Sequence, residues 1–270
     1  MISKKKQAFL KELANKSLLP FGLELHRKKG GGRVRTDKDK QATAGHIVEF
    51  LGPSAIGKNT IFNKCKHKLK YPWNYDYDAS KLGDANLDDL HGSAYRGLLW
   101  SRLGKIRESP KPISSETETV INIVKRVQAD ISMRGVEYTR GFFLREGLFA
   151  YFTSDIEKLD ESQLQQMMSG RSFVIILPDD TETAVTRFLE RIQTTGKRPN
   201  YFAGMSPAEL YDAQERAINA QRTFGLTVES MGRPVLWLKA EDDIESNARK
   251  VIDFERVIFE TVTAELTVNQ

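Results

Sequence analysis

The stretch EFLGPSAIGKNTIF, residues 49–62, has the residue types and spacing of a phosphate-binding loop. Gly52 to Lys58 read GPSAIGK and match the pattern G-x-x-x-x-G-K. Glycines in this pattern let the backbone curl so that successive N–H groups point at one phosphate, and the lysine neutralises the outer phosphates. We therefore predict that these loop residues bind a nucleotide: Gly52, Ser54, Ala55, Ile56, Gly57, Lys58, Asn59 and Thr60.

The residue after the lysine departs from the commonest form of such loops. Asn59 occupies the position where a Ser or Thr hydroxyl often ligates Mg²⁺, and a hydroxyl comes one residue later as Thr60. Either side chain could meet the metal or a phosphate, and the sequence leaves the choice open. The order Gly-Lys-x-Thr resembles the loops of adenylate and cytidylate kinases, and GPSxxGK resembles those of guanylate and cytidylate kinases.

The elements around the loop predict an α/β fold. An apolar run at 46–51 precedes the loop and a helical stretch at 58–70 follows it, which is the strand, loop and helix order that phosphate binding requires. Apolar strands that alternate with helices indicate a mostly parallel sheet. We predict further strands at 74–78, 141–147, 172–180 and 234–240, and further helices at 114–135, 181–192, 206–225 and 242–266.

Residues 46–262 resemble a P-loop small-molecule kinase of the nucleoside-monophosphate kinase and shikimate kinase group. The resemblance is specific at the loop and loose elsewhere. It implies a three-layer fold with a five-stranded parallel sheet flanked by helices, and it implies ATP and Mg²⁺ as cofactors. It also implies acceptor-binding residues at the strand ends and a lid that carries arginines.

The resemblance implies roles for three carboxylates. Asp76 and Asp78 end the second predicted strand, where shikimate-kinase-like proteins use an Asp-x-Asp for the acceptor hydroxyl and Mg²⁺; a polar turn is the alternative. Glu146 follows the strand GFFL, where it could orient the metal or take the acceptor proton, or instead pair with Arg145 or Arg140 at the surface.

Arginines are expected to serve the phosphates and the acceptor. Arg187 and Arg191 lie four residues apart on one predicted helix, and Arg198 follows in the next loop, where the resemblance places a lid that stabilises the transferring phosphoryl group. A charged, solvated helix face is the alternative. An anionic acceptor would need arginine forks, and the region between the second and third strands offers four without distinguishing among them: Arg96, Arg102, Arg107 and Arg134.

The charge is concentrated near the start of the chain. The net charge is +5, but residues 1–45 hold twelve Lys/Arg and four Asp/Glu, so the remaining chain is slightly acidic. We predict a basic amphipathic arm with a flexible linker at 1–45, followed by the kinase-like domain at 46–270. This imbalance makes nucleic acid an unlikely partner, whereas residues 1–29 could contact a membrane surface peripherally. The alternative is that this arm is solvated or disordered and contacts no membrane.

Several classes of protein are excluded or disfavoured. No apolar run approaches the roughly 20 residues that cross a bilayer. The stretch MISKKKQAFLKELANK has a basic n-region but no long apolar h-region and no small-residue cleavage site, so we do not expect it to be a signal peptide. Cys65 is the single cysteine, so no intramolecular disulfide can form and we expect a cytoplasmic location, or one peripheral to the inner face of the membrane.

We therefore predict an ATP- and Mg²⁺-dependent kinase acting on a small-molecule or glycan acceptor. Lys58 and the carboxylates and arginines above are the candidate catalytic residues. Two alternatives stay open. One is a P-loop sulfotransferase-like enzyme, which the intact Gly57-Lys58 disfavours. The other is a non-catalytic nucleotide-binding module, which Asn59 and Arg145 favour.

Overall fold

The computed structural model describes residues 46–70, 73–75, 89–108, 113–135, 141–196, 202 and 204–268. Within them lies a five-stranded sheet in which all paired strands are parallel and the order is β2-β3-β1-β4-β5. This confirms the predicted α/β class with a five-stranded parallel sheet. The strands are β1 (Ile47–Leu51), β2 (Trp73–Tyr75), β3 (Gly141–Leu144), β4 (Arg171–Leu177) and β5 (Val235–Lys239).

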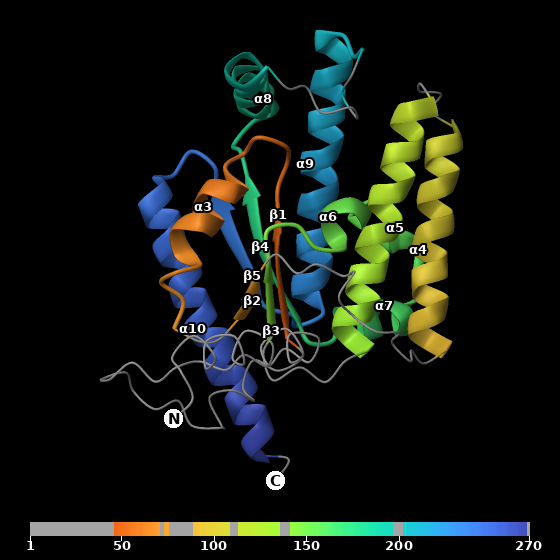
Figure 1. Cartoon of the computed structure of the whole chain (residues 1–270). Coiled ribbons are helices and arrows are strands. Elements are labelled where there is room, and N and C mark those ends of the chain that lie inside the picture. Colours follow the sequence, from red (N-terminus) through yellow and green to blue (C-terminus); the bar gives the residue numbers. More distant parts are fainter. Residues whose placement is uncertain are drawn as a thin grey trace, which may run out of the picture.

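Helices cover both faces of the sheet, which makes three layers (Figure 1). The first face packs on α3 and α10, and the second packs on α4, α5, α6, α7 and α9. The helices are α3 (Lys58–Cys65), α4 (Asp89–Glu108), α5 (Ile113–Gly135), α6 (Phe149–Phe152), α7 (Glu161–Met168), α8 (Thr181–Thr195), α9 (Pro207–Ser230) and α10 (Ile244–Val268), with a 3-10 turn at Ile156–Lys158.

Alternation along the central strands sorts the two cores. Val48 and Phe50 of β1 face the α3 and α10 side, whereas Leu51 faces the α4, α5 and α9 side. Every residue of β1 and β4 is buried, as expected for central strands of a sheet covered on both faces. Glu49 belongs to this fully buried strand, so its charge requires partners inside the protein.

The strand order determines where a ligand can bind. The chain leaves β1 toward β2 at one edge of the sheet and leaves β4 toward β5 at the other edge. Neighbouring parallel strands whose connections depart in opposite directions open a crevice beyond their carboxyl ends. The predicted phosphate loop follows β1 directly, and it therefore lies at this crevice.

Side-chain caps mark the starts of α8 and α9, and the ends of α3, α8, α9 and α10 differ from the predicted bounds. Asp180 accepts a hydrogen bond from Thr183 N at 2.7 Å and caps α8, and Ser206 forms a capping box with Glu209 at the start of α9. Helix α9 runs past Gly225, the predicted end, because that glycine lets the helix pack closely on Trp237 and Ile175. Helix α3 ends at Cys65 rather than at residue 70.

Other findings bear on the chain as a whole. No helix in the described part of the chain combines the length and the apolar character needed to span a bilayer. Cys65 is buried, and burial raises the pKa of its thiol to about 12, which agrees with a structural role. The predicted arm at 1–45 lies outside the described residues.

Candidate functional site

The loop after β1 has the backbone geometry of a phosphate cradle. Gly52 has a φ of +151°, and a Cβ at this position would lie 2.6 Å from the carbonyl oxygen of Ile176. Gly57 has a φ of +100° and is the N-cap of α3. Ala55 has a φ of +65°, an uncommon conformation for a residue with a side chain and one that tends to occur at functional sites. The loop therefore curls as the sequence pattern predicts.

The lysine of the motif lies across the loop. Lys58 Nζ donates hydrogen bonds to the carbonyl oxygens of Gly52 at 2.6 Å and Pro53 at 2.8 Å. Its side chain is buried, and burial lowers the pKa of Lys58 to about 8; Arg191 adds to this lowering, and Glu146 opposes it. The ammonium group is thus held at the loop beside one acidic and one basic group.

The start of α3 supplies further donors. Gly57 provides no side-chain cap, and the first acceptor within α3 is its carbonyl oxygen, which accepts from Thr60 N at 3.0 Å and Ile61 N at 3.1 Å, so the N–H groups of Lys58 and Asn59 precede the hydrogen bonds of the helix. Such a helix end attracts anions through its N–H groups and its dipole. Asn59 and Thr60 of the first turn are both exposed, but only Asn59 lines the neighbouring pocket.

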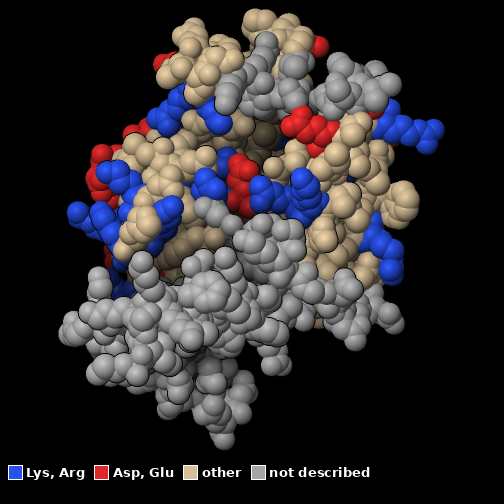
Figure 2. Space-filling view, viewed as in Figure 1, with Lys and Arg blue, Asp and Glu red and all other residues tan. Residues whose placement is uncertain are grey.

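A pocket of 370 Å³ opens beside the loop, within the size range of small-molecule sites. The described residues that line it come from α3, α5, the end of β3, the turn between β3 and α6, and α8. On the face shown in Figure 2, basic and acidic side chains meet near the middle. The lining residues are Asn59, Arg126, Ala129, Met133, Leu144, Arg145, Glu146, Gly147, Leu148 and Arg191.

Glu146 lines this pocket and interacts with two basic groups, Lys58 of the loop and Arg126 of the pocket lining. Its charge acts on Lys58, and its carboxylate Oε2 lies 3.8 Å from Arg126 Nη2. Arg126 Nη1 also donates a hydrogen bond to the carbonyl oxygen of Glu146 at 2.9 Å. The partner of Glu146 is thus Arg126 of α5, and the structure places this carboxylate beside the loop lysine, where it could accept a proton or meet a metal.

The two helical arginines of the predicted lid have different environments. Arg191 lines the pocket, acts electrostatically on Lys58, and has no hydrogen bond or ion pair from its guanidinium within the described residues. Arg187 donates a hydrogen bond to the carbonyl oxygen of Ala240 at 3.0 Å, so its side chain reaches the end of β5. The structure therefore brings Arg191 to the loop and directs Arg187 toward the junction of β5 and α10.

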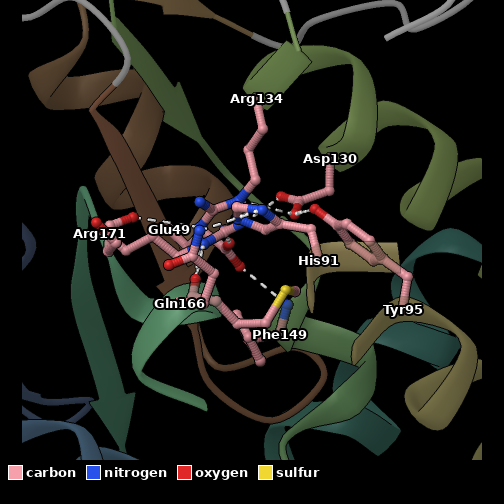
Figure 3. A network of polar contacts seen from close by, with 10 residues as sticks. Glu49, His91, Tyr95, Asp130, Arg134, Phe149, Gln166 and Arg171 are labelled. Carbon is pink, nitrogen blue, oxygen red and sulfur yellow. Dashed lines mark hydrogen bonds and ion pairs between the residues drawn. The ribbon is translucent and has the colours of Figure 1, made fainter. Parts of the chain in front are cut away.

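A buried polar network lies beneath the pocket (Figure 3). Glu49 of β1 pairs with Arg171 of β4, and Arg171 also pairs with Asp130 of α5. Tyr95 of α4 donates a hydrogen bond to Asp130 at 2.5 Å. Because these four side chains are almost fully buried, each charge depends on the others for compensation. The network thus links two strands and two helices.

The same network holds the turn that carries Glu146. The backbone N–H of Phe149 donates to Glu49 Oε2 at 3.0 Å, and a Cβ on Gly147 would lie 2.2 Å from Glu49 Cδ. Arg171 Nε donates to the carbonyl oxygen of Met167 at 2.9 Å, and its guanidinium lies over the Phe149 ring. The turn at 145–149 therefore rests directly on the buried carboxylate.

Burial and neighbouring charges set the protonation of the network. Burial raises the pKa of Glu49 to about 7, and the Asp130 carboxylate adds to this effect, although Arg171 opposes it. Burial also acts to raise the pKa of Asp130, but the guanidinium groups of Arg171 and Arg134 outweigh it and hold this pKa below its ordinary value. Asp130 is the carboxylate that stays charged most readily.

Other predicted residues lie elsewhere. Asp76, Asp78 and Arg198 fall outside the described residues, so their predicted roles stay predictions. The four arginines considered for an anionic acceptor do not line the pocket. Arg102 and Arg134 have other partners: Arg102 lies 3.5 Å from Asp155, and Arg134 donates to the carbonyl oxygen of Met167.

Sequence reasoning missed the network and Arg126. The signals were a glutamate inside an apolar strand, an aspartate inside the apolar stripe of a helix, and an arginine directly before the most apolar strand: Glu49, Asp130 and Arg171. Arg126 carried no such signal, because it is one of several charged residues on α5.

Comparisons with known proteins give remote likenesses. No protein-family model matches the chain, and no curated protein matches it. Solved structures of deoxyadenosine kinase from M. mycoides align with it. The structure with dCMP and dCDP is 14% identical with a TM-score of 0.42, covering 78% of this chain and 99% of that one. The structure with dATP is 14% identical with a TM-score of 0.41, and the structure with dCTP is 13% identical with a TM-score of 0.40. Each of these two alignments covers 77% of this chain and 97% of the kinase chain. We base the function on the loop and the pocket.

Proposed function

We propose that the protein is an ATP- and Mg²⁺-dependent phosphotransferase that acts on a small-molecule or glycan acceptor. One observation carries this proposal: a phosphate-type loop next to a pocket that Asn59, Glu146 and Arg191 line, with the charges of Glu146 and Arg191 acting on Lys58 of the loop. Phosphoryl transfer depends on positioning and on charge stabilisation more than on covalent chemistry, and this pocket offers groups of both signs next to the loop.

The residues present suit a nucleotide and a magnesium ion. The loop N–H groups, the uncapped start of α3 and Lys58 would hold the β- and γ-phosphates. Asn59 and Glu146 both line the pocket and carry oxygens of the type that Mg²⁺ prefers, with phosphate oxygens as further ligands. Because Thr60 is not among the lining residues, we favour Asn59 over Thr60, with Asp76 as a further candidate ligand. Bound Mg²⁺ neutralises charge that develops on the phosphate oxygens.

The proposed reaction is a direct transfer. The acceptor hydroxyl oxygen forms a bond to the γ-phosphorus, the bond from this phosphorus to the bridging oxygen breaks, and ADP leaves with that oxygen. The hydroxyl proton passes to Glu146, or to Asp76 or Asp78 as predicted from the sequence. Arg191, whose guanidinium is unpaired in the described part of the chain, stabilises the migrating group, and Arg198 and Arg187 are the other predicted lid residues.

Product formation tests this function. Purified protein is incubated with Mg-ATP and a panel of nucleosides, nucleotides, sugars and glycan fragments, and ADP and phosphorylated acceptor are followed by mass spectrometry. We expect one class of acceptor to gain a phosphoryl group with the wild type and with Lys64→Ala, but not with Lys58→Ala. Lys64 is a matched control because it lies on the same helix and pairs with Glu245 at the surface.

Binding of ATP without any product across the panel would favour the non-catalytic module instead. Peripheral membrane contact through residues 1–29 stays a separate prediction. Loss of binding to anionic vesicles after deletion of 1–45 would support it.

A further inference from the structure

Three guanidinium groups line the pocket beside the loop. They belong to Arg126, Arg145 and Arg191, and Glu146 is the one acidic residue among the described residues that line it. Arg191 acts on Lys58 and belongs to the loop end of the pocket. Arg126 comes from α5 and pairs with Glu146, whose charge also acts on Lys58. The α5 wall therefore holds a guanidinium that the phosphate loop does not account for.

Arg126 is held in one orientation. Its Nη1 is anchored on the carbonyl oxygen of Glu146 at 2.9 Å, and its guanidinium lies over the Tyr151 ring, 5.4 Å from the centroid. Its Nη2 lies 3.8 Å from Glu146 Oε2, which is too long for a hydrogen bond. The remaining N–H groups form no other hydrogen bond within the described residues, although the side chain lines the pocket and is 38% exposed.

Such an arrangement suits an oxyanion on the bound ligand. A guanidinium presents a planar fork of donors that matches carboxylate, phosphate or sulfate, and fixing the plane beforehand reduces the entropy lost on binding. Arg145, from the turn after β3, also lines the pocket, and its guanidinium lies over the Phe62 ring, 5.8 Å from the centroid. An oxyanion on the ligand would give Arg126 an acceptor at hydrogen-bond distance, which the Glu146 carboxylate at 3.8 Å does not provide.

We propose that the acceptor carries an anionic group of its own and that Arg126 binds this group. The proposal rests on the proposed function and specifies its acceptor as an oxyanion-bearing molecule. It assigns this role to Arg126 in place of the four arginines considered from the sequence. Arg126 is then the specificity-determining residue, and the hydroxyl to be phosphorylated lies toward Lys58 and Glu146.

Inorganic phosphate is the first probe. The phosphate loop is filled with Mg²⁺ and a non-hydrolysable ATP analogue, and thermal unfolding is followed as phosphate is added, with potassium chloride at matched ionic strength as the reference. We expect saturable stabilisation of the wild type of roughly 2–4 °C. Arg126→Gln should weaken phosphate binding about 10- to 100-fold, as for the loss of a charged hydrogen-bond pair. Arg222→Gln on the exposed face of α9 should bind like the wild type.

The outcomes separate this proposal from the proposed function. If the ATP analogue does not stabilise the wild type, both fail. If the analogue stabilises but phosphate adds nothing beyond the chloride reference, the acceptor proposal fails and the nucleotide site stands. Equal phosphate binding by the wild type and Arg126→Gln also overturns the role of Arg126.

Acceptor preference provides a second readout. Matched pairs that differ by one phosphate, such as a nucleoside and its monophosphate or a hexose and its phosphate, are compared in the transfer assay. We expect the wild type to prefer the anionic member, and Arg126→Gln to lose this preference about 10- to 100-fold in kcat/KM. A purely structural role for Arg126 would instead lower turnover of both members equally, and that result would contradict the proposal. Arg126→Lys keeps the charge without the fork and should retain part of the preference.

Discussion

Replacing Gly147 by alanine tests how closely the turn at 145–149 rests on the buried network. A Cβ at this position would lie 2.2 Å from Cδ, 2.4 Å from Oε2 and 2.6 Å from Cγ of Glu49, where real contacts essentially never fall below 3.0 Å. Glu49 cannot move aside freely, because it is fully buried and bonded to Arg171 and Phe149. The backbone of Gly147 has no positive φ, so the clash is the expected cause of any effect.

The magnitude follows from two contributions. Overpacking in a well-packed interior costs about 1–3 kcal/mol, and loss of a hydrogen bond to a buried charged group costs about 1.5–3 kcal/mol. Because either the turn or the carboxylate can yield, we expect Gly147→Ala to lower the free energy of unfolding by about 2–4 kcal/mol, or roughly 5–15 °C in Tm. Transfer activity should fall as well, since Glu146 and Arg145 are carried by the same turn.

Thermal and denaturant unfolding provide the assay, with Gly104→Ala as the matched control. A Cβ on Gly104 of α4 meets no atom within 4 Å, so alanine should stabilise this helix by up to about 1 kcal/mol. Glu49→Ala removes the Glu49 atoms that the new Cβ would meet. The double variant Glu49→Ala, Gly147→Ala should therefore have nearly the same free energy of unfolding as Glu49→Ala alone. Wild-type stability of Gly147→Ala, or additive effects in the double variant, would refute the reasoning.

Three further predictions concern the site. Burial lowers the pKa of Lys58 to about 8, so the Lys58 side chain loses its charge above that pH in the free protein. Because ATP binds the charged form, the Kd for ATP should rise about tenfold per pH unit above pH 8 in a calorimetric pH series. A Kd that stays constant up to pH 9.5 would contradict this prediction. Asn59→Ala should raise the Mg²⁺ concentration needed for half-maximal activity, while Thr60→Ala should not; the reverse order would assign the metal to Thr60. Arg191→Gln should reduce kcat by about 100-fold or more without changing Tm. Arg187→Gln should reduce Tm, because this variant loses the hydrogen bond from Arg187 to the carbonyl oxygen of Ala240. A fall in Tm for Arg191→Gln would indicate a structural role for Arg191 instead.

The sequence predicted the parts of the fold that depend on local pattern. The strand, loop and helix from residue 47 to residue 65 follow from an apolar run, glycines at fixed spacing and a helical pattern. Strands β3, β4 and β5 were found because each is a short apolar run, whereas β2 was predicted at 74–78, a polar stretch, and lies at Trp73–Tyr75. Helices α8 and α9 begin after Asp180 and Ser206, residue types that favour the cap position. Helices α4 and α7 were not anticipated, since much of their stability comes from packing on the sheet and on each other.

The candidate site was predicted where one segment builds it and missed where several do. Lys58 and Asn59 belong to the motif itself. The pairing of Glu49 with Arg171 depends on β1 lying beside β4, a neighbour relation between residues 122 apart that no local pattern encodes. Arg126 faces the pocket because α5 packs at one particular rotation on the sheet, and a count of charges on a helix does not give that rotation.

The divergence of Arg187 and Arg191 has the same cause. Residues four apart share a helical face, as predicted, but long side chains on one face can reach different partners. The carbonyl oxygen of Ala240 engages Arg187, and this leaves Arg191 to face the loop. Side-chain roles on α8 therefore depend on β5, which lies more than 40 residues further along the chain.

Calorimetric titration with Mg-ATP tests the central claim most directly, namely that residues 52–60 bind nucleotide phosphates. We predict saturable binding by the wild type and by Lys64→Ala, and loss of that binding in Lys58→Ala at a temperature where thermal unfolding shows that this variant is folded without nucleotide. Absence of binding by the wild type, or equal affinity of Lys58→Ala and the wild type, would contradict the claim and leave the loop as an ordinary connection between β1 and α3.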